Sequence, residues 1–434
     1  MSERNQATAR GGDILAIGFG TTVMMWVGGY LARKPATTVP AVGILIFFVL
    51  CLLAGGILAG RYTRRGIWGG LWAGCVAALL NLLILGSLLA GDQPNRLVPS
   101  ALIWLPGSIV FSAMLAAVGA WWGSRRPYLN PEAINWQAGF CLAGVAATFL
   151  LLIAGGLVTS HQAGLAVVDW PNSYGYSMFL FPLSRMTGGV YYEHSHRLLG
   201  SLVGLTTIVL AVYVSLNDSR RWLRRLAWGA VILVIFQGVL GGLRVTGRFT
   251  LSQSLSDVSP NIHLAIAHGV LGQVFFCVMI ALAVFSTTGW QTLAPAVRPG
   301  AFMDRLICSV LVGLLLVQLV MGAIVRHVSG MLLLHMSLGA LAFVLVLHTG
   351  ARAWGLNLDR PVLQRLGLSA IGAVCVQILL GFTALLGIST TAAAGSPTAL
   401  DVILTTTHQA MGAVVFALAV MLMLWTYRLC RPHR

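Results

Sequence analysis

Twelve long apolar blocks run through this chain, and they constrain its fold more than any other feature. Each block holds about twenty residues with few charges, which is enough for an α-helix to cross the roughly 30 Å hydrocarbon core of a bilayer. Lipid offers the backbone no hydrogen-bond partner, so such segments must satisfy their own N–H and C=O groups. The expected spans are residues 14–32, 40–60, 67–90, 100–123, 136–159, 191–214, 222–243, 262–285, 306–325, 331–354, 364–388 and 400–427.

Composition supports an integral membrane protein and excludes a set of soluble domains. Hydrophobic residues make up 58% of the chain and charged residues 9%, whereas a soluble chain carries about 25% charged residues. The net charge of +16 comes almost entirely from Arg residues that are spread between the apolar blocks. They form no patch, so we expect the lipid bilayer and no nucleic acid as a partner. None of the seven cysteines falls in an outer loop, so no structural disulfide is indicated.

Basic residues in the connections predict the orientation of the spans. The two termini and the even-numbered loops together hold 19 Lys and Arg residues, and the odd-numbered loops hold 7. Because cytoplasmic loops carry the excess of basic residues, we expect both termini in the cytoplasm of a bacterial-type plasma membrane.

The chain divides near residue 130. The first four spans contain no His and no recognisable motif, and a basic, proline-broken stretch follows them. We therefore expect an N-terminal membrane extension over 1–130, a first four-helix half over 131–300 and a second half over 301–434. The extension is either an assembly or interaction module or a set of additional packing helices.

The two halves repeat one another, and the repeat carries histidines. Gln237 precedes His268 by 31 residues, and Gln377 precedes His408 by the same interval. The distance from His196 to His268 is 72 residues, and that from His335 to His408 is 73. His161 matches His327 at the ends of the fifth and ninth spans.

Each half thus places two His at similar depth on two non-adjacent helices, which is what two axial ligands of a heme require. Intramembrane ionisable residues are functional candidates, although a single His often serves only in interhelical hydrogen bonding. Zinc is less favoured because it needs three or four clustered ligands. The sites face the outer side if both termini are cytoplasmic. The expected heme ligands are His196 and His268 in the first half, and His335 and His408 in the second.

The remaining histidines are weaker candidates. His161 and His327 lie at outer span ends, where they are either interfacial residues or contacts to heme propionates. His194 points about 200° around the helix from His196 and cannot share its ligand position. The others lack a repeat partner or lie off the ligand face: His263, His348 and His433.

One acid stands beside the first His pair. Glu193 is three residues before His196, so both lie on one helix face. It is either a carboxylate at a reactive heme edge or an interfacial partner of Arg197 at i+4. Asp169 lies in a long aromatic loop that only the first half carries, and this loop is expected to cap that half. Because only the first half has an acid and a cap, we expect the reaction there and electron transfer in the second half.

At these motifs the sequence resembles the heme A synthase family, over about residues 136–427. The matching segments are GGLVT, GLAVVDWP, YGYSMFLFP, EHSHRLLG, LGGLRVT, LAIAHGVLGQ, GAIVRH, LLLHMSLGA and TTHQAMGA. The resemblance implies eight helices in two pseudo-symmetric four-helix bundles, here preceded by four extra helices. Unlike some family members, this chain has no cysteine pair in the outer loops, and its second-half loop is very short.

The resemblance also implies an enzyme that oxidises the C8 methyl of heme O to a formyl group, giving heme A for cytochrome oxidase assembly. Glu193 would then be catalytic, His196 and His268 would hold the iron of the substrate heme, and His335 and His408 would hold a heme b. The implied partners are the farnesyltransferase that supplies heme O and an electron donor of unknown identity. The residues alone also fit a diheme b-type cytochrome that only transfers electrons, or a repeat-built transporter without heme.

Overall fold

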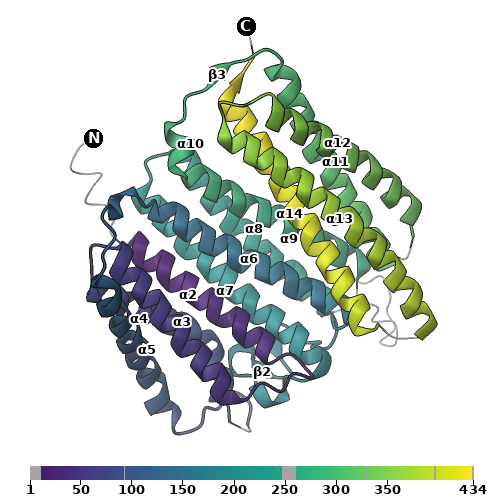
Figure 1. The fold of residues 1–434 in the computed structure, drawn as a ribbon. Coiled ribbons are helices and arrows are strands. Elements are labelled where there is room, and N and C mark those ends of the chain that lie inside the picture. The colour runs from purple at the N-terminus through teal and green to yellow at the C-terminus, as the bar shows by residue number, and fades with distance from the viewer. Residues whose placement is uncertain (1–10, 92, 247–260, 329, 395–396, 433–434) are drawn as a thin grey trace. The chain divides into compact units, whose positions relative to one another are not determined.

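The computed structural model describes residues 11–91, 93–246, 261–328, 330–394 and 397–432. These residues form an all-α protein with twelve helices long and apolar enough to cross a membrane, which confirms the expected number of spans. Figure 1 shows them in chain order. They are α2 (Gly12–Ala32), α3 (Ala41–Tyr62), α4 (Ile67–Leu88), α5 (Ala101–Ser124), α6 (Trp136–Ser160), α7 (Gly188–Asn217), α8 (Arg221–Val245), α9 (Ile262–Ser286), α11 (Ala301–Val328), α12 (Leu332–Gly355), α13 (Pro361–Ala394) and α14 (Ala399–Leu429).

Short elements lie in the connections. β1 (Asn172–Ser173) pairs antiparallel with β2 (Tyr176–Ser177), and β3 (Ala296–Val297) pairs parallel with β4 (Cys430–Arg431). The other short elements are α10 (Thr288–Thr292) and the 3₁₀ turns η1 (Pro131–Ala133), η2 (Met178–Leu180) and η3 (Leu183–Arg185). The seven cysteines, all within the described residues, form no disulfide.

Two compact units make up the chain. The first combines residues 1–151 with 164–235, and the second combines 152–163 with 236–434. Helices α6 and α8 therefore contribute segments to both units. The domain limits expected near residues 130 and 300 stay predictions.

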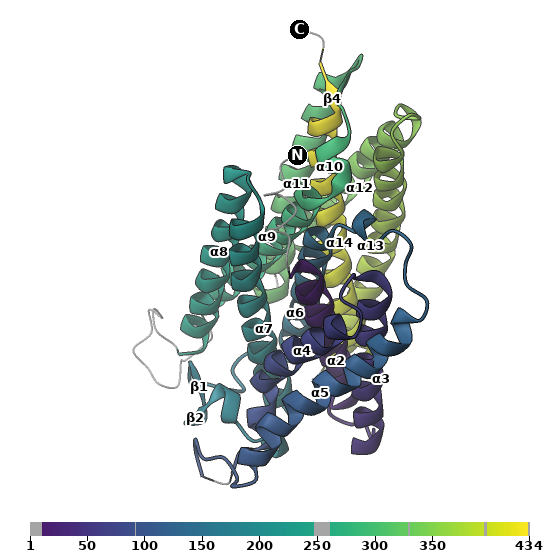
Figure 2. The ribbon, with the colours of Figure 1, turned by 90° about the vertical axis from the view of Figure 1, so that its left-hand side faces the viewer.

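In the first unit, α2 to α5 pack against one another through glycines. Helices α3, α4 and α5 each carry a G-x-x-x-G sequence, which lets helix backbones approach closely in a membrane. A Cβ on Gly56 or on Gly60 would lie 2.0 Å from the carbonyl oxygen of Ala116 or Ala120, so no larger residue fits. The sequence analysis missed this motif, which identifies the extension as a tightly packed helix cluster. α2 and α4 also contact α7 (Figure 2).

In the second unit, α11 to α14 form a closed four-helix bundle. Each helix contacts the next along the chain, α14 contacts α11, and α9 packs against α11 and α14. The division of residues 131–434 into two pseudo-symmetric four-helix bundles stays a prediction.

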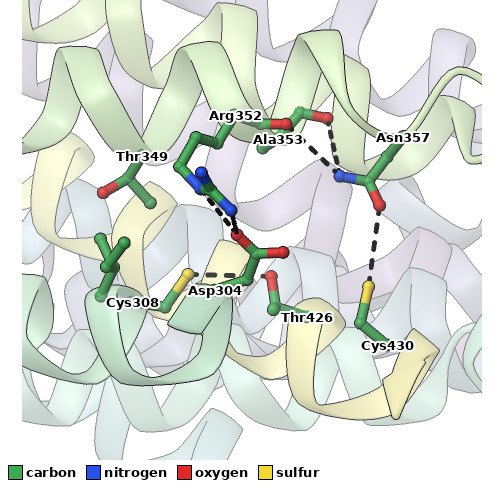
Figure 3. A pocket seen from close by; sticks show the side chains of 9 residues that line it. Asp304, Cys308, Thr349, Arg352, Ala353, Asn357, Thr426 and Cys430 are labelled. Atoms are coloured by element: carbon green, nitrogen blue, oxygen red, sulfur yellow. Dashed lines mark hydrogen bonds and ion pairs between the residues drawn. The ribbon is translucent and has the colours of Figure 1, made fainter. Parts of the chain in front are cut away.

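A polar cluster closes one end of this bundle (Figure 3). Arg352 near the end of α12 pairs with Asp304 in the first turn of α11 at 2.8 Å. The Sγ of Cys430 lies 3.7 Å from Oδ1 of Asn357, and the Sγ of Cys308 lies 3.7 Å from Oγ1 of Thr426. These contacts join the ends of α11, α12 and α14. His335 begins α12, about 25 Å from Arg352 along the helix axis, so the cluster is separate from the histidine site.

Candidate functional site

The rings of His335 and His408 face one another inside the α11–α14 bundle. His335 lies in the first turn of α12, and His408 lies within α14, on the helix diagonally across the ring of contacts. Their ring centroids are 6.4 Å apart and their planes are inclined by 80°. The structure thus brings together the two second-half histidines that the repeat predicts.

This separation fits two imidazoles on opposite sides of one iron. With metal–nitrogen bonds of about 2 Å and a distance of roughly 1 Å from each nitrogen to its ring centre, the centroids would lie about 6 Å apart. The Nδ1 atoms of His335 and His408 are buried and have no hydrogen-bond partner among the described residues. No group of three or more His, Cys, Asp or Glu in the described chain gathers closely enough to hold a bare metal ion. Two axial histidines suit heme, because the porphyrin supplies the other four ligands.

Each ring lies against a glycine of the preceding helix. A Cβ on Gly322 of α11 would lie 3.1 Å from Cε1 of His335, and a Cβ on Gly381 of α13 would lie 3.0 Å from Cε1 of His408. Both distances are shorter than ordinary carbon–carbon contacts. A side chain at either position would therefore push against the histidine ring, and the two glycines leave the space that the rings of His335 and His408 occupy.

A glutamine precedes each of these glycines by four residues and contacts the same histidine. Gln318 donates its side-chain N–H to the backbone carbonyl of His335 at 2.9 Å. The side-chain nitrogen of Gln377 lies 3.4 Å from Nε2 of His408. Contact with a ring nitrogen, as in His408, can fix the orientation of a ligand histidine, whereas the Gln318 bond restrains only the backbone of His335.

The same arrangement recurs between α8 and α9. A Cβ on Gly241 would lie 3.3 Å from Cε1 of His268. The side-chain amide of Gln237 is oriented with its nitrogen toward His268. In this orientation it donates to Nδ1 of His268 at 2.9 Å and to the backbone carbonyl of His268 at 3.1 Å. A Q-x-x-x-G pattern thus faces a histidine in three helix pairs. The sequence analysis matched Gln237 with Gln377 but missed Gln318, although the recurring pattern would have found it. α6 carries Leu152 at this position, four residues before Gly156.

The first predicted pair falls in two different units. His268 belongs to the second unit, where Gln237 and Gly241 hold it as described. His196 lies on α7 in the first unit. The pairing of His196 with His268 stays a prediction.

Glu193 and Arg197 form a buried ion pair on α7. Nε of Arg197 lies 3.2 Å from Oε1 of Glu193, and both side chains are only 8% exposed. The expected i+4 pair is therefore present, but it is buried rather than lying on an open surface. A buried carboxylate is costly without a partner, and the guanidinium of Arg197 provides one for Glu193.

Arg197 also binds the loop that precedes α7. Its guanidinium donates to the carbonyl oxygens of Val167 at 2.6 Å, Asp169 at 2.7 Å and Asn172 at 3.0 Å. We call residues 164–187 the cap loop. The guanidinium therefore joins Glu193 directly to the backbone of this loop.

His194 is a second anchor of the cap loop. Its ring is fully buried, and its Nδ1 lies 3.0 Å from the hydroxyl oxygen of Ser173. The ring also packs against Phe181, with ring centroids 4.9 Å apart. From the sequence, His194 was expected not to share the ligand position of His196, and no other role was predicted for it. Its opposite position on α7 explains the role, because that face meets the cap loop.

Asp169 organises the turn of the cap loop. Its carboxylate accepts the backbone N–H groups of Tyr174 at 2.7 Å and Gly175 at 2.9 Å. Burial acts to raise the pKa of Asp169, but these hydrogen bonds and the charge of Arg197 outweigh it and lower the pKa below its ordinary value.

The remaining histidines lie elsewhere. His161 directly follows α6, and His327 is in the last turn of α11. The side chains of His263 and His348 are exposed on α9 and α12. His433 lies outside the described residues.

Comparison with known proteins places part of the chain in a family. A family model described as cytochrome oxidase assembly protein, COX15-CtaA, matches residues 138–334. The heme A synthase of Alkalihalophilus pseudofirmus is 30% identical over 154 residues, which are 35% of this chain and 47% of that protein. The heme A synthase of Parvibaculum lavamentivorans is 27% identical over 216 residues, with 43% of this chain and 61% of that protein covered.

A protein named protoheme IX farnesyltransferase, from Haloarcula marismortui, is 26% identical over 161 residues, with 37% of this chain and 32% of that protein covered. The chain spans about half the length of the first curated relatives it matches. The matched region contains Glu193, Arg197 and the cap loop, together with the glutamine–glycine pairs of α8 and α11. Over residues 138–334, the chain is thus similar to the COX15-CtaA family of cytochrome oxidase assembly proteins.

Proposed function

We propose that this protein is a heme A synthase, which oxidises the C8 methyl of heme O to a formyl group and so provides heme A for cytochrome oxidase. The observation that carries the proposal is the facing pair His335 and His408, 6.4 Å apart in the bundle of a chain with this family's sequence. Relatives named heme A synthase support the reaction.

The two halves have different tasks in this proposal. His335 and His408 would hold a heme b, with Gly322, Gly381 and Gln377 positioning the rings and Gln318 binding the backbone of His335. His196 and His268 would hold the iron of heme O. The resident heme would supply one-electron transfer, and the protein side chains position the substrate and handle protons.

Glu193 would act at the edge of the substrate heme. Oxidation of a methyl to a formyl removes protons as well as electrons from the carbon. A carboxylate next to that carbon can accept a proton or stabilise developing positive charge. Arg197, 3.2 Å from Glu193, would hold the carboxylate in position for this role.

The proposal includes a topology and partners. Both termini lie in the cytoplasm and the heme sites face the outer side, in line with the distribution of basic residues. Heme O comes from a farnesyltransferase, and the similarity to a protein of that name supports a functional relation. The oxidation also needs a redox partner: an electron donor if O2 supplies the formyl oxygen, or an acceptor of four electrons if water supplies it.

The test is the product. The full chain is expressed in a host that makes heme O but lacks its own heme A synthase. Pyridine hemochrome spectra and the mass of the extracted hemes should show a formyl heme, and the purified protein should retain heme b. Bound heme b without any formyl product would point to a diheme electron carrier, and purified protein without heme would contradict both functions.

A further inference from the structure

The N-terminal helices α2–α5 lie outside the residues that match the family. Within the first unit, α4 contacts both α7 and the η2 turn of the cap loop, and α2 contacts α7. The extension therefore reaches the same structures that surround Glu193.

Three residues at the end of α4 and just after it hold the cap loop by its backbone. Gly86 is so close that a Cβ there would lie 2.4 Å from the carbonyl oxygen of Phe179. The hydroxyl of Ser87 donates to the same carbonyl at 3.4 Å. Oδ1 of Asn95 accepts the backbone N–H of Ser177 at 2.6 Å.

The extension also contacts α7 just before the ion pair. The hydroxyl of Tyr191 donates to the carbonyl oxygen of Tyr30 on α2, and the two rings are 5.4 Å apart. Tyr191 is two residues before Glu193, so this contact restrains the start of the helix that carries the acid.

The cap loop is thus held from two sides. Arg197 and His194 bind it from α7, while Gly86, Ser87 and Asn95 bind it from the extension. If one side were released, the loop carbonyls could move away from the guanidinium of Arg197. The guanidinium would then be held less firmly beside Glu193.

We propose that the four-helix extension is an internal brace that holds the cap loop on α7 and so positions the Arg197–Glu193 pair. Gly86, Ser87 and Asn95 are its positioning residues. The inference rests on the proposed function for its catalytic consequence, but the mechanical part stands on these contacts alone.

The test uses the full chain with Asn95→Gly and Asn95→Asp. Asn95 has a positive φ of 62°, which Gly adopts freely, so Asn95→Gly removes the acceptor without adding strain. Asn95→Asp keeps an acceptor oxygen and serves as the rescue. Gly86→Leu blocks the close approach to Phe179, and Gly107→Leu on α5, where a Cβ would meet nothing within 4 Å, is its matched control.

Hydrogen exchange of the cap-loop amides is the first measurement. Loss of one hydrogen bond should speed exchange at residues 166–187 about three- to ten-fold in Asn95→Gly. Gly86→Leu should show at least this effect, whereas Asn95→Asp and Gly107→Leu should exchange like the wild type. Unchanged exchange in both Asn95→Gly and Gly86→Leu would overturn the brace.

Heme A formation and its pH profile are the second measurement. Loosening the brace should lower the yield and shift the pH profile in Asn95→Gly and Gly86→Leu, while the heme b spectrum stays unchanged. Faster loop exchange with a wild-type yield and pH profile would overturn the positioning role. If the wild type makes no heme A, the proposed function fails, but the exchange measurement still decides whether the extension holds the loop.

Discussion

The side chains of the second half show how single residues would define the proposed heme b site. The rings of His335 and His408 face each other, Gln377 contacts the ring of His408, and Gln318 binds the backbone carbonyl of His335. Because the protein would provide only these two iron ligands, neither is expected to be replaceable by a neighbour.

His335→Ala and His408→Ala should each abolish the low-spin heme b signal, because one axial ligand is lost. The measurement is the visible and electron paramagnetic resonance spectrum of purified protein from a host without heme O. His348→Ala, whose exposed side chain lies on the same helix as His335, is the matched control and should keep the signal. A full bis-histidine spectrum in both site variants would contradict the assignment.

Glu193→Gln keeps the side-chain volume and removes the charge. Arg197 retains three backbone carbonyl acceptors in the cap loop, so we expect the variant to fold. Heme A formation should fall about 10²- to 10⁴-fold, the usual contribution of a positioned acid–base group. The hydroxymethyl intermediate should accumulate while the heme b spectrum remains, as measured by mass spectrometry of extracted hemes. A wild-type yield would reduce Glu193 to a structural partner of Arg197.

At the scale of elements, pairs of helices build the site through small residues. The Q-x-x-x-G pattern on α8, α11 and α13 places a histidine ring against a glycine of the neighbouring helix each time. Helices in lipid gain little from apolar contact with each other, so close backbone approach and hydrogen bonds determine their pairing.

Gly381→Ala should disturb the heme b site, because the added methyl would lie 3.0 Å from Cε1 of His408 and displace the ring. We expect lower heme b content and altered resonance parameters in the purified variant. Gly372→Ala on the same helix, where a Cβ meets nothing within 4 Å, should bind heme b like the wild type. Equal heme content and spectra in the two variants would show that the glycine contact does not restrain the ring.

The cap loop should weaken in acid. The pKa of Asp169 is lowered in the folded protein, so this carboxylate stabilises the loop above its ordinary pKa, and the stabilisation is lost as pH falls through the lowered pKa. Protection of the amides of Tyr174 and Gly175 from hydrogen exchange should thus be constant near neutral pH and decline below about pH 4. Asp169→Asn should remove this pH dependence, and its persistence would assign it to another group.

At the scale of the whole molecule, twelve helices form two compact units, and the matched family region contributes to both. The basic residues are concentrated in the termini and the even-numbered connections. This asymmetry predicts one orientation for all twelve helices together.

After Arg434, a reporter that functions only in the cytoplasm should be active, and one that functions only outside the membrane should be inactive. Both termini are expected on the cytoplasmic side. Fusions after Ser184 in the cap loop provide the opposite case and should be active only with an external reporter. An externally active C-terminal fusion would overturn the orientation and place the histidine sites on the inner side.

The sequence alone predicted the number of spans, an integral membrane protein and the repeated histidines. It did so because lipid forces every spanning segment into a self-satisfied helix, and because helix periodicity alone places Glu193 and Arg197 on one face. The three G-x-x-x-G sequences and the Q-x-x-x-G pattern were also readable in principle.

Contacts between residues far apart in the sequence became visible only in the folded structure. Asn95 binds Ser177, Gly86 lies against Phe179, and His194 anchors the cap loop, although no local pattern marks any of these residues. Such contacts depend on how helices and loops far apart in the chain pack together, and a periodicity records only which face of its own helix a residue occupies. For that reason the proposed role of the N-terminal extension and the contacts of His194 follow from packing, while the proposed heme ligands follow from the repeat.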